Sequence, residues 1–238
     1  MAATRRPESQ EGPPAPSIDR IRTAALRIFA QRGYHATSVR DITRACGLVP
    51  AALYNHFASK ADLLQDLLLQ GHHTVNMRVE KALRSAGPRA DQRLECVTRE
   101  LAQFHAEFTE LATLSNREFR ALPEPHSRVI ISLRRRFRGL LEDILYDGIA
   151  EGIFSVPMVN GTPAVTVTAM SILDSLQHIA EWYRPDRKFS PQEIAGFYAE
   201  WIAASLHVQP HPAAAPDLPA PAQTAGRPPG QPAADAPG

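Results

Sequence analysis

Apolar residues recur at helical spacing along almost the whole interval from Ser17 to Val208, and no segment there alternates apolar with polar residues as a half-buried strand would. Of the 21 prolines in the 238 residues, 13 lie before Ser17 or after Leu206. The chain is therefore expected to be all-α, with about nine helices and no sheet. Residues 1–16 and the Pro/Ala-rich stretch 209–238 have too few apolar side chains to bury and are expected to be a disordered arm and tail.

Helix start and stop signals are clearest in the first third of the chain. Gly33 and Gly47 stand where a left-handed residue would end a helix, Ser38 and Asp41 form a capping-box pattern, and Ser59 precedes a long apolar-striped segment. Prolines and glycines interrupt the later pattern at fewer points. The helices are expected at 18–32, 38–46, 50–57, 60–85, 91–110, 111–122, 125–152, 162–183 and 191–206.

Charge is unevenly distributed, although the formal net charge is only +1. From Ser17 to Lys60 there are seven basic and two acidic residues, whereas from Ala61 to Val208 there are 16 basic and 19 acidic residues. A basic module joined to a mildly acidic one predicts phosphate contact through the first module only. We therefore expect a DNA-binding domain at 17–63 and a second domain at 64–208.

Composition also excludes several classes of protein. Two cysteines, Cys46 and Cys96, cannot form a disulfide scaffold, and the first residues lack the apolar core of a secretory signal. The longest uncharged run, 152–173, contains prolines, asparagine and glycine that are unfavourable in a membrane span. No nucleophile elbow, phosphate loop or zinc motif is present. We expect a soluble, cytoplasmic protein with no membrane partner, no cofactor, no metal site and no catalytic residues, although an all-helical enzyme remains a distant alternative.

The stretch 38–57, SVRDITRACGLVPAALYNHF, has the design of a helix-turn-helix. A helix of about two turns is followed by Gly47, which permits a tight turn, and by a second short helix that starts at Pro50. Val49, just before Pro50, lacks the side-chain acceptor of a usual N-cap. The second helix is expected to turn one set of residues toward a DNA major groove: Pro50, Ala51, Ala52, Asn55 and His56.

A more specific pattern extends on both sides of this motif. It consists of Phe29-Ala30-x-x-Gly33-Tyr34, then Thr37-Ser38-Val39-Arg40-Asp41-Ile42 and Ala45-x-Gly47, then Leu53-Tyr54-x-His56-Phe57-x-Ser59-Lys60-x-x-Leu63. In these spacings residues 18–64 resemble the DNA-binding domain of the TetR family of transcriptional repressors. The resemblance implies an all-helical homodimer with a three-helix N-terminal DNA-binding module and a C-terminal domain that dimerises and holds a small-molecule inducer.

The resemblance also assigns roles to particular positions. Thr37 and Ser38 are expected to meet a phosphate at the start of their helix, and Tyr54, His56 and Lys60 match positions that contact the DNA backbone. Base reading is expected from Asn55, which can pair with adenine, and from Pro50, Ala51 and Ala52. Arg40, on the solvent face of its helix, is a further candidate for contact with DNA.

The last two helices carry apolar stripes that fit a four-helix interface between two copies of the chain. The alternative is that both stripes face the core of their own domain. The residues expected at the dimer interface are Ile172, Leu176, Ile179, Tyr183, Phe197 and Trp201.

For the effector pocket, the polar candidates are His105, Asn116, Arg117, Arg120 and His178, each with a surface or core role as the alternative. The basic run 134–138 could meet a phosphate or CoA, but the preferred interpretation is a solvated helix face, with Arg138 pairing with Glu142. The segment from Trp182 to Ile194 resembles one in a TetR branch tied to acyl-CoA and steroid catabolism.

These observations predict a ligand-responsive transcriptional repressor. The dimer would bind a palindromic operator, and a small apolar or acyl-type effector, with an acyl-CoA as one candidate, would release it. The alternative is a TetR-like activator or a ligand-independent DNA-binding protein. A closed apolar pocket of a few hundred Å³ would favour the first function, and a filled C-terminal core would favour the second.

Overall fold

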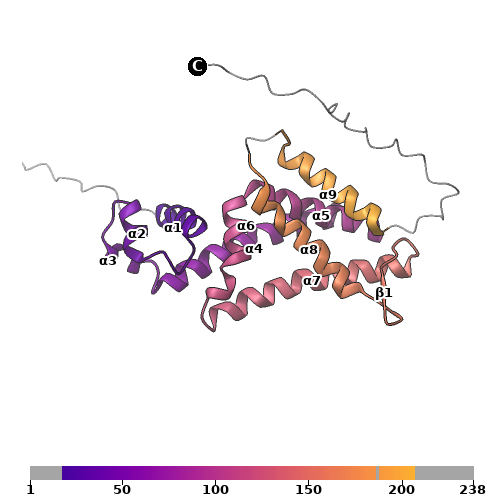
Figure 1. The fold of residues 1–238 in the computed structure, drawn as a ribbon, viewed down its shortest axis with the longest axis horizontal. Coiled ribbons are helices and arrows are strands. Elements are labelled where there is room, and N and C mark those ends of the chain that lie inside the picture. Colours follow the sequence, from indigo (N-terminus) through magenta and orange to yellow (C-terminus); the bar gives the residue numbers. More distant parts are fainter. Residues whose placement is uncertain (1–17, 186–187, 207–238) are drawn as a thin grey trace, which may run out of the picture. The chain divides into compact units, whose positions relative to one another are not determined.

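The computed structural model describes residues 18–185 and 188–206, so the predicted N-terminal arm and C-terminal tail lie outside the described residues. The described part is helical almost throughout, as expected (Figure 1). Its helices are α1 (Ile18–Arg32), α2 (Val39–Ala45), α3 (Pro50–Tyr54), α4 (Lys60–Ser85), α5 (Ala90–Glu107), α6 (Thr109–Arg117), the 3-10 helix η1 (Phe119–Ala121), α7 (His126–Ala150), α8 (Val165–Trp182) and α9 (Pro191–Leu206).

The residues that the sequence predicts as helix caps do cap helices in the structure. Ser38 and Asp41 form the complete capping box at the start of α2, and the Ser59 side chain accepts from the backbone N–H of Asp62 at the start of α4. Gly33 and Gly47 have φ angles of +82° and +68°, which only glycine adopts at little cost. Val49 makes no side-chain cap hydrogen bond at the start of α3. These local predictions are confirmed.

One prediction about the fold is wrong. A two-stranded antiparallel ribbon, β1 (Met158–Val159) with β2 (Thr162–Pro163), connects α7 to α8. Its turn is Asn160-Gly161, and both residues have positive φ, of 50° and 76°. An Asn-Gly pair favours this tight hairpin turn, but strands of two residues are too short to produce an alternating pattern.

Two clusters of buried apolar side chains hold the described part together. The larger cluster lies among α4, α5, α7, α8 and α9. The smaller cluster lies beneath α1, α2 and α3, and it includes the start of α4 together with four residues of the C-terminal half: Leu114, Phe119, Leu122 and Ile130. Helix α1 packs directly on α6, and Phe119 of η1 and Ile130 of α7 belong to the same buried cluster. Since α4 runs through the predicted domain boundary at 63/64, that boundary stays a prediction.

Gly148 allows the chain after α7 to fold back closely on the helix. A Cβ atom at this position would lie 1.9 Å from Cδ2 of Phe154, whose side chain is 3% exposed. We expect Gly148→Ala to lower the free energy of unfolding by about 1–3 kcal/mol, because the ring has no room to move. Urea denaturation measures this effect.

The matched control is Gly139→Ala in the same helix, where an added Cβ meets nothing within 4 Å. This variant is expected to be more stable than the parent by about 0.5–1 kcal/mol, because alanine is the better helix former. If both variants were stabilised, the close packing of Phe154 on Gly148 would not hold in solution.

Candidate functional site

The outer surface of α2 and α3 carries most of the side chains predicted to face DNA. Ile42 and Leu53 are fully buried against α1 and α4, and their burial orients the opposite faces of both short helices toward solvent. Tyr54 is 53% exposed, and Ala52 is half-buried. The other candidates on this surface are exposed: Ser38, Arg40, Pro50, Ala51, Asn55 and His56.

Thr37 and Lys60 both make hydrogen bonds within the protein. Thr37 is 1% exposed, and its hydroxyl donates to the carbonyl of Gly33 at 2.8 Å. The Lys60 ammonium donates to the carbonyls of Tyr34 (2.8 Å) and Thr37 (2.7 Å) and lies 4.1 Å from the centroid of the Tyr34 ring. Burial lowers the pKa of Lys60. Both side chains therefore hold the loop before α2 in place. The Thr37 hydroxyl is buried and engaged within the protein, whereas the phosphate contact of Lys60 stays a prediction, since its half-buried ammonium has a third N–H donor.

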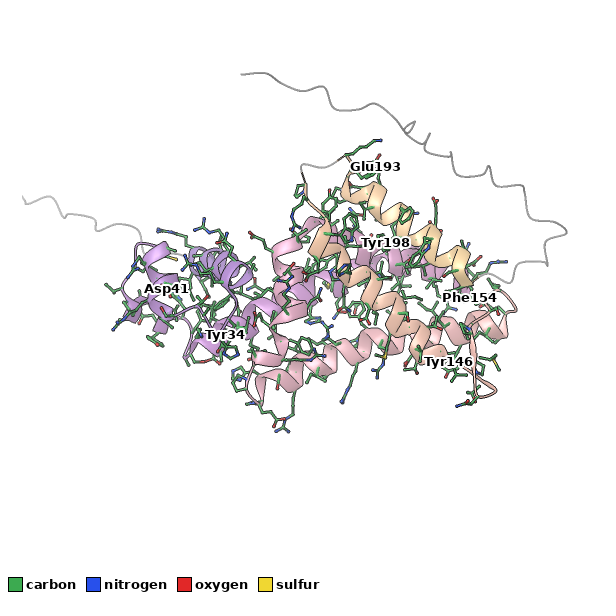
Figure 2. All side chains as sticks on the ribbon, viewed as in Figure 1. Tyr34, Asp41, Tyr146, Phe154, Glu193 and Tyr198 are labelled. Atoms are coloured by element: carbon green, nitrogen blue, oxygen red, sulfur yellow. The ribbon has the colours of Figure 1, made fainter. Side chains whose placement is uncertain are left out.

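The Ser38 hydroxyl is also engaged within the protein. It donates to Oδ2 of Asp41 at 2.5 Å and accepts from the Asp41 backbone N–H. The hydrogen bonds from the side chain and the backbone of Ser38 lower the pKa of Asp41. Figure 2 shows Asp41 and Tyr34 at the end of the described part that carries α1 to α3. Ser38 is exposed but fixed, so it shapes this surface as a cap.

Two polar contacts join α4 to other helices, one to α1 and one to α7. Arg22 of α1 binds the Asp66 carboxylate of α4 through two hydrogen bonds of 2.7 and 2.9 Å. His126, the first residue of α7, lies 2.8 Å from Asp62 through its Nε2 atom. The pKa of Asp62 is lowered by the Ser59 hydroxyl and then by His126. Sequence analysis missed these contacts, because their partners are 44 and 64 residues apart.

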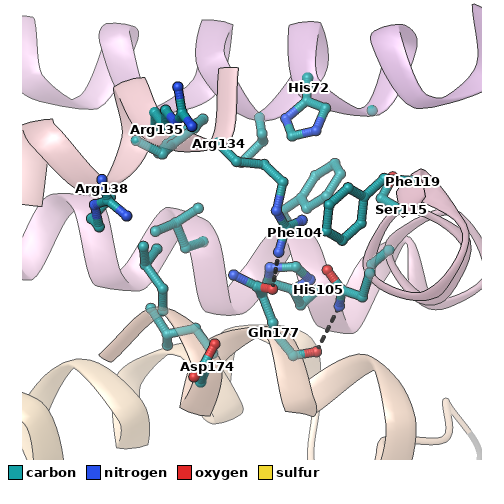
Figure 3. A pocket seen from close by; sticks show the side chains of 18 of the residues that line it. His72, Phe104, His105, Ser115, Phe119, Arg134, Arg135, Arg138, Asp174 and Gln177 are labelled. Carbon is teal, nitrogen blue, oxygen red and sulfur yellow. Dashed lines mark hydrogen bonds between the residues drawn. The ribbon is translucent and has the colours of Figure 1, made fainter. Parts of the chain in front are cut away.

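A cavity of about 340 Å³ lies in the C-terminal half and is lined by residues of α4, α5, α6, η1, α7 and α8 (Figure 3). Of the predicted pocket residues, His105, Asn116 and Arg120 line it. Arg117 and His178 do not, and we correct these two predictions. Arg117 is turned outward and forms an ion pair with Glu181, and His178 is exposed on α8.

Both apolar and polar side chains line the cavity. Apolar side chains are contributed by α4, α5, η1 and α8: Val75, Leu101, Phe104, Phe119, Leu173 and Leu176. Burial lowers the pKa of His72 to about 4 and that of His105 to about 3, and the charge of Arg134 acts in the same direction on both. Both imidazoles are therefore neutral at neutral pH.

The basic run on α7 is not simply a solvated face. Arg138 does lie 3.4 Å from Glu142, as predicted, but Arg134, Arg135 and Arg138 all line the cavity. Burial and the positive charge of Arg120 lower the pKa of Arg134. Sequence analysis missed Arg134 and His72 as cavity residues. The available signal was spacing, since 134 and 138 are one helical turn apart and so share a face.

Four of the six predicted dimer residues are core residues of a single chain. Ile172, Leu176, Ile179 and Tyr183 are at most 6% exposed within one protomer, so they cannot form an interface, and this prediction is corrected. Phe197 and Trp201 are 61% and 51% exposed on α9. Helix α8 exposes Val167 and Met170, whose fractions are 61% and 46%. The interface assignment of Phe197 and Trp201 stays a prediction.

Other kinds of site are not found in the part of the chain that the structure describes. Within it, no group of three or more His, Cys, Asp or Glu is arranged to hold a metal ion. None of its helices combines the length and the apolar character needed to cross a membrane.

Helices α2 and α3 form an exposed pair of short helices that are joined by a tight glycine turn. They pack on a larger helical domain that contains a cavity, and this combination is typical of a helix-turn-helix regulator. Two family models match the chain. One, described as bacterial regulatory proteins of the tetR family, matches residues 21–67. The other, described as the tetracyclin repressor-like C-terminal domain, matches residues 87–206. The chain therefore belongs to the TetR family, whose members are transcriptional regulators and not enzymes.

Individual relatives extend the similarity over both halves. The HTH-type transcriptional repressor KstR2 of Mycobacterium tuberculosis is 27% identical over 184 residues, which are 76% of this chain and 88% of the relative. The structure of PfmR, a TetR-family regulator from Thermus thermophilus, is 30% identical, with a TM-score of 0.67 over 78% of this chain and 98% of that one. AibR, solved in complex with isovaleryl coenzyme A and operator DNA, shares the fold at 22% identity, with a TM-score of 0.65 over 76% of this chain and 97% of that one.

Proposed function

We propose that this protein is a ligand-responsive transcriptional repressor that binds a palindromic operator as a homodimer. A small apolar or acyl-type effector, with an acyl-CoA among the candidates, would bind in the cavity and release the DNA. One observation carries this proposal: Phe119 lines the cavity and is also a member of the buried cluster that supports α1 to α3. An effector in the cavity therefore touches the packing that orients the DNA-binding helices.

The exposed face of α2 and α3 supports the DNA-binding half of this proposal. Asn55 carries the amide that pairs with adenine, and the methyl groups of Ala51 and Ala52 suit thymine. Tyr54, His56 and Arg40 would contact phosphates and set the position of the helix in the groove. Ser38 would act beside them through the exposed start of α2. The short side chains on α3 favour close approach of its backbone to the bases.

The need for two recognition helices supports the dimer. A five-residue helix such as α3 contacts few base pairs, so specificity would come from two half-sites about one helical turn or more apart. The exposed apolar side chains of α8 and α9, Phe197 and Trp201 among them, supply the surface that a partner would cover.

The cavity and two of the relatives support a ligand-responsive function. A volume of about 340 Å³ is within the range of small-molecule sites, and it favours this function over that of a ligand-independent DNA-binding protein. KstR2 is named a repressor, and AibR was solved with isovaleryl coenzyme A and operator DNA. Release requires only that the effector bind one dimer geometry more tightly than the other. A regulator of this kind works beside the chromosome, which supports a cytoplasmic location.

Footprinting on the DNA upstream of the protein's own coding region tests the proposal. We expect a protected region with two-fold symmetry at protein concentrations in the nanomolar range, since specific sites bind at about 10⁻⁸–10⁻¹¹ M. Addition of octanoate or octanoyl-CoA is expected to weaken the protection. A footprint that resists every acyl compound would favour the ligand-independent alternative, and one that strengthens would favour an activator.

A further inference from the structure

Arg134 carries a positive charge at the cavity, and the carboxylate that acts on it there, Asp174, raises its pKa without forming an ion pair among the described residues. Its side chain extends from α7 across the cavity, and Nη2 donates to Oε1 of Gln177 on α8 at 2.7 Å (Figure 3). Its guanidinium also lies 4.6 Å from the ring centroid of Phe119. Within residues 18–185 and 188–206, no carboxylate forms an ion pair with it at 4.0 Å or less. A partly buried charge in this state is costly unless a ligand completes its surroundings.

Two imidazoles that line the same cavity also have nitrogen atoms without hydrogen-bond partners among the described residues. His72 and His105 are 9% and 8% exposed, and Nε2 of the first and Nδ1 of the second have no hydrogen-bond partner among the residues that the structure describes. Both residues line the cavity and carry no charge at neutral pH. A neutral imidazole nitrogen can donate a hydrogen bond to an oxygen atom. Buried polar atoms without partners are rare in native proteins, so their gathering here indicates a polar group that is supplied from outside.

We propose that the effector places an anionic oxygen group, a carboxylate or a phosphate, on Arg134 inside the cavity, while its apolar part packs on Phe104 and Phe119. The planar guanidinium offers a fork of donors that matches such a group. His72 and His105 would donate to its remaining oxygen atoms. This inference rests on the proposed effector site and adds which end of the effector is buried and which residue selects it.

The charges around the cavity support an anion. Three further arginines line it, Arg120, Arg135 and Arg138, against the single carboxylate of Asp174. Arg138 is neutralised in part by Glu142, at 3.4 Å. Arg134 is the one that bonds to Gln177 in the interior, so it is the residue expected to set the orientation of the ligand.

Two pairs of probes distinguish the two sources of the anion. Octanoate is compared with octanamide, which has the same chain without the charge. Octanoyl-CoA is compared with the octanoyl thioester of N-acetylcysteamine, which lacks the phosphates. Isothermal titration of the full-length protein without DNA is expected to show that the anionic member of at least one pair binds about tenfold more tightly than its neutral partner.

The variants assign this preference to Arg134. Arg134→Gln is expected to abolish the preference, whereas Arg134→Lys, which keeps the charge, retains part of it. Arg136→Gln is the matched control, because Arg136 lies on the same helix with 73% of its side chain exposed, and it should behave like the parent. Thermal unfolding verifies that each variant is folded. If Arg134→Gln does not fold, the partial loss of preference in Arg134→Lys still tests the inference.

Three outcomes would overturn the inference: equal binding within both pairs, a preference that survives in Arg134→Gln, or no binding of any of the four probes. Failure of the proposed function is a separate outcome, because that function is tested by the binding of operator DNA and not by the binding of the probes. A protein that binds octanoate through Arg134 but does not bind operator DNA would retain this anion site and lose the repressor function.

Discussion

Replacing both Phe197 and Trp201 by glutamate is expected to convert the protein from a dimer to a monomer. Operator affinity should then fall by about 100-fold or more, because binding to the second half-site is no longer linked to binding to the first. Both side chains are more than half exposed on α9. Their substitution therefore leaves the core of the protomer intact but places four negative charges at the interface of a symmetric dimer. Analytical ultracentrifugation gives the mass, and fluorescence anisotropy gives the operator affinity.

Met77→Glu is the matched control for this experiment. Met77 is 50% exposed on α4, so the substitution introduces one glutamate per protomer, half the charge of the double variant, at a similarly exposed apolar position away from α8 and α9. The control is expected to remain a dimer with parental affinity. If the double variant remained a dimer as well, the outer surface of α8 and α9 would not be the interface.

The second large effect is expected on the DNA-binding surface. Arg40→Ala combined with Tyr54→Ala should weaken operator binding by about 10- to 100-fold at fixed salt. Because Arg40 is the charged member and the dimer carries two copies of it, the slope of log affinity against log salt concentration should fall by about 2, the value for two phosphate contacts. Both side chains are exposed, so the melting temperature should stay near that of the parent. Anisotropy titrations at several salt concentrations measure the affinity and the slope.

Two single variants sharpen the interpretation. Arg136→Ala removes an exposed charge from the C-terminal half and should leave the salt slope unchanged. Lys60→Ala should instead lower thermal stability, because the Lys60 ammonium joins α4 to the carbonyls of Tyr34 and Thr37. An unchanged affinity and slope in the Arg40/Tyr54 variant would show that this face of α2 and α3 does not bind DNA.

The cavity was predictable only in part. His105, Asn116 and Arg120 were chosen as polar residues in a helical domain, and they line the cavity. Arg134 belongs to a run of arginines that would suit a solvated helix face equally well, and its position becomes clear only when Gln177 of α8 is placed opposite it. Residue type and spacing identify the shared face of a helix, but they do not identify what covers that face.

The assignment of four residues to the dimer interface failed for the same reason. The stripe of Ile172, Leu176 and Ile179 was correctly recognised as apolar, and it is buried, but by the protomer's own helices. Hydrophobic burial has no direction of its own, so a stripe can be covered equally well by a neighbouring helix or by a second chain. The exposed residues on the outer sides of α8 and α9 can be identified only after the inner sides are filled.

The sequence by itself determined the helices, their caps, the two glycine turns and the helix-turn-helix, because each of these depends on residues within about four positions of one another. Tertiary structure decided that Lys60 supports a loop, that Arg134 points inward, and that Phe119 belongs to both the cavity and the core beneath the DNA-binding helices. These placements depend on distant partners, 23 residues away for Lys60 and 43 residues away for Arg134. Such partners become neighbours only in the folded protein, where burial and charge pairing choose among faces that the local pattern leaves equivalent.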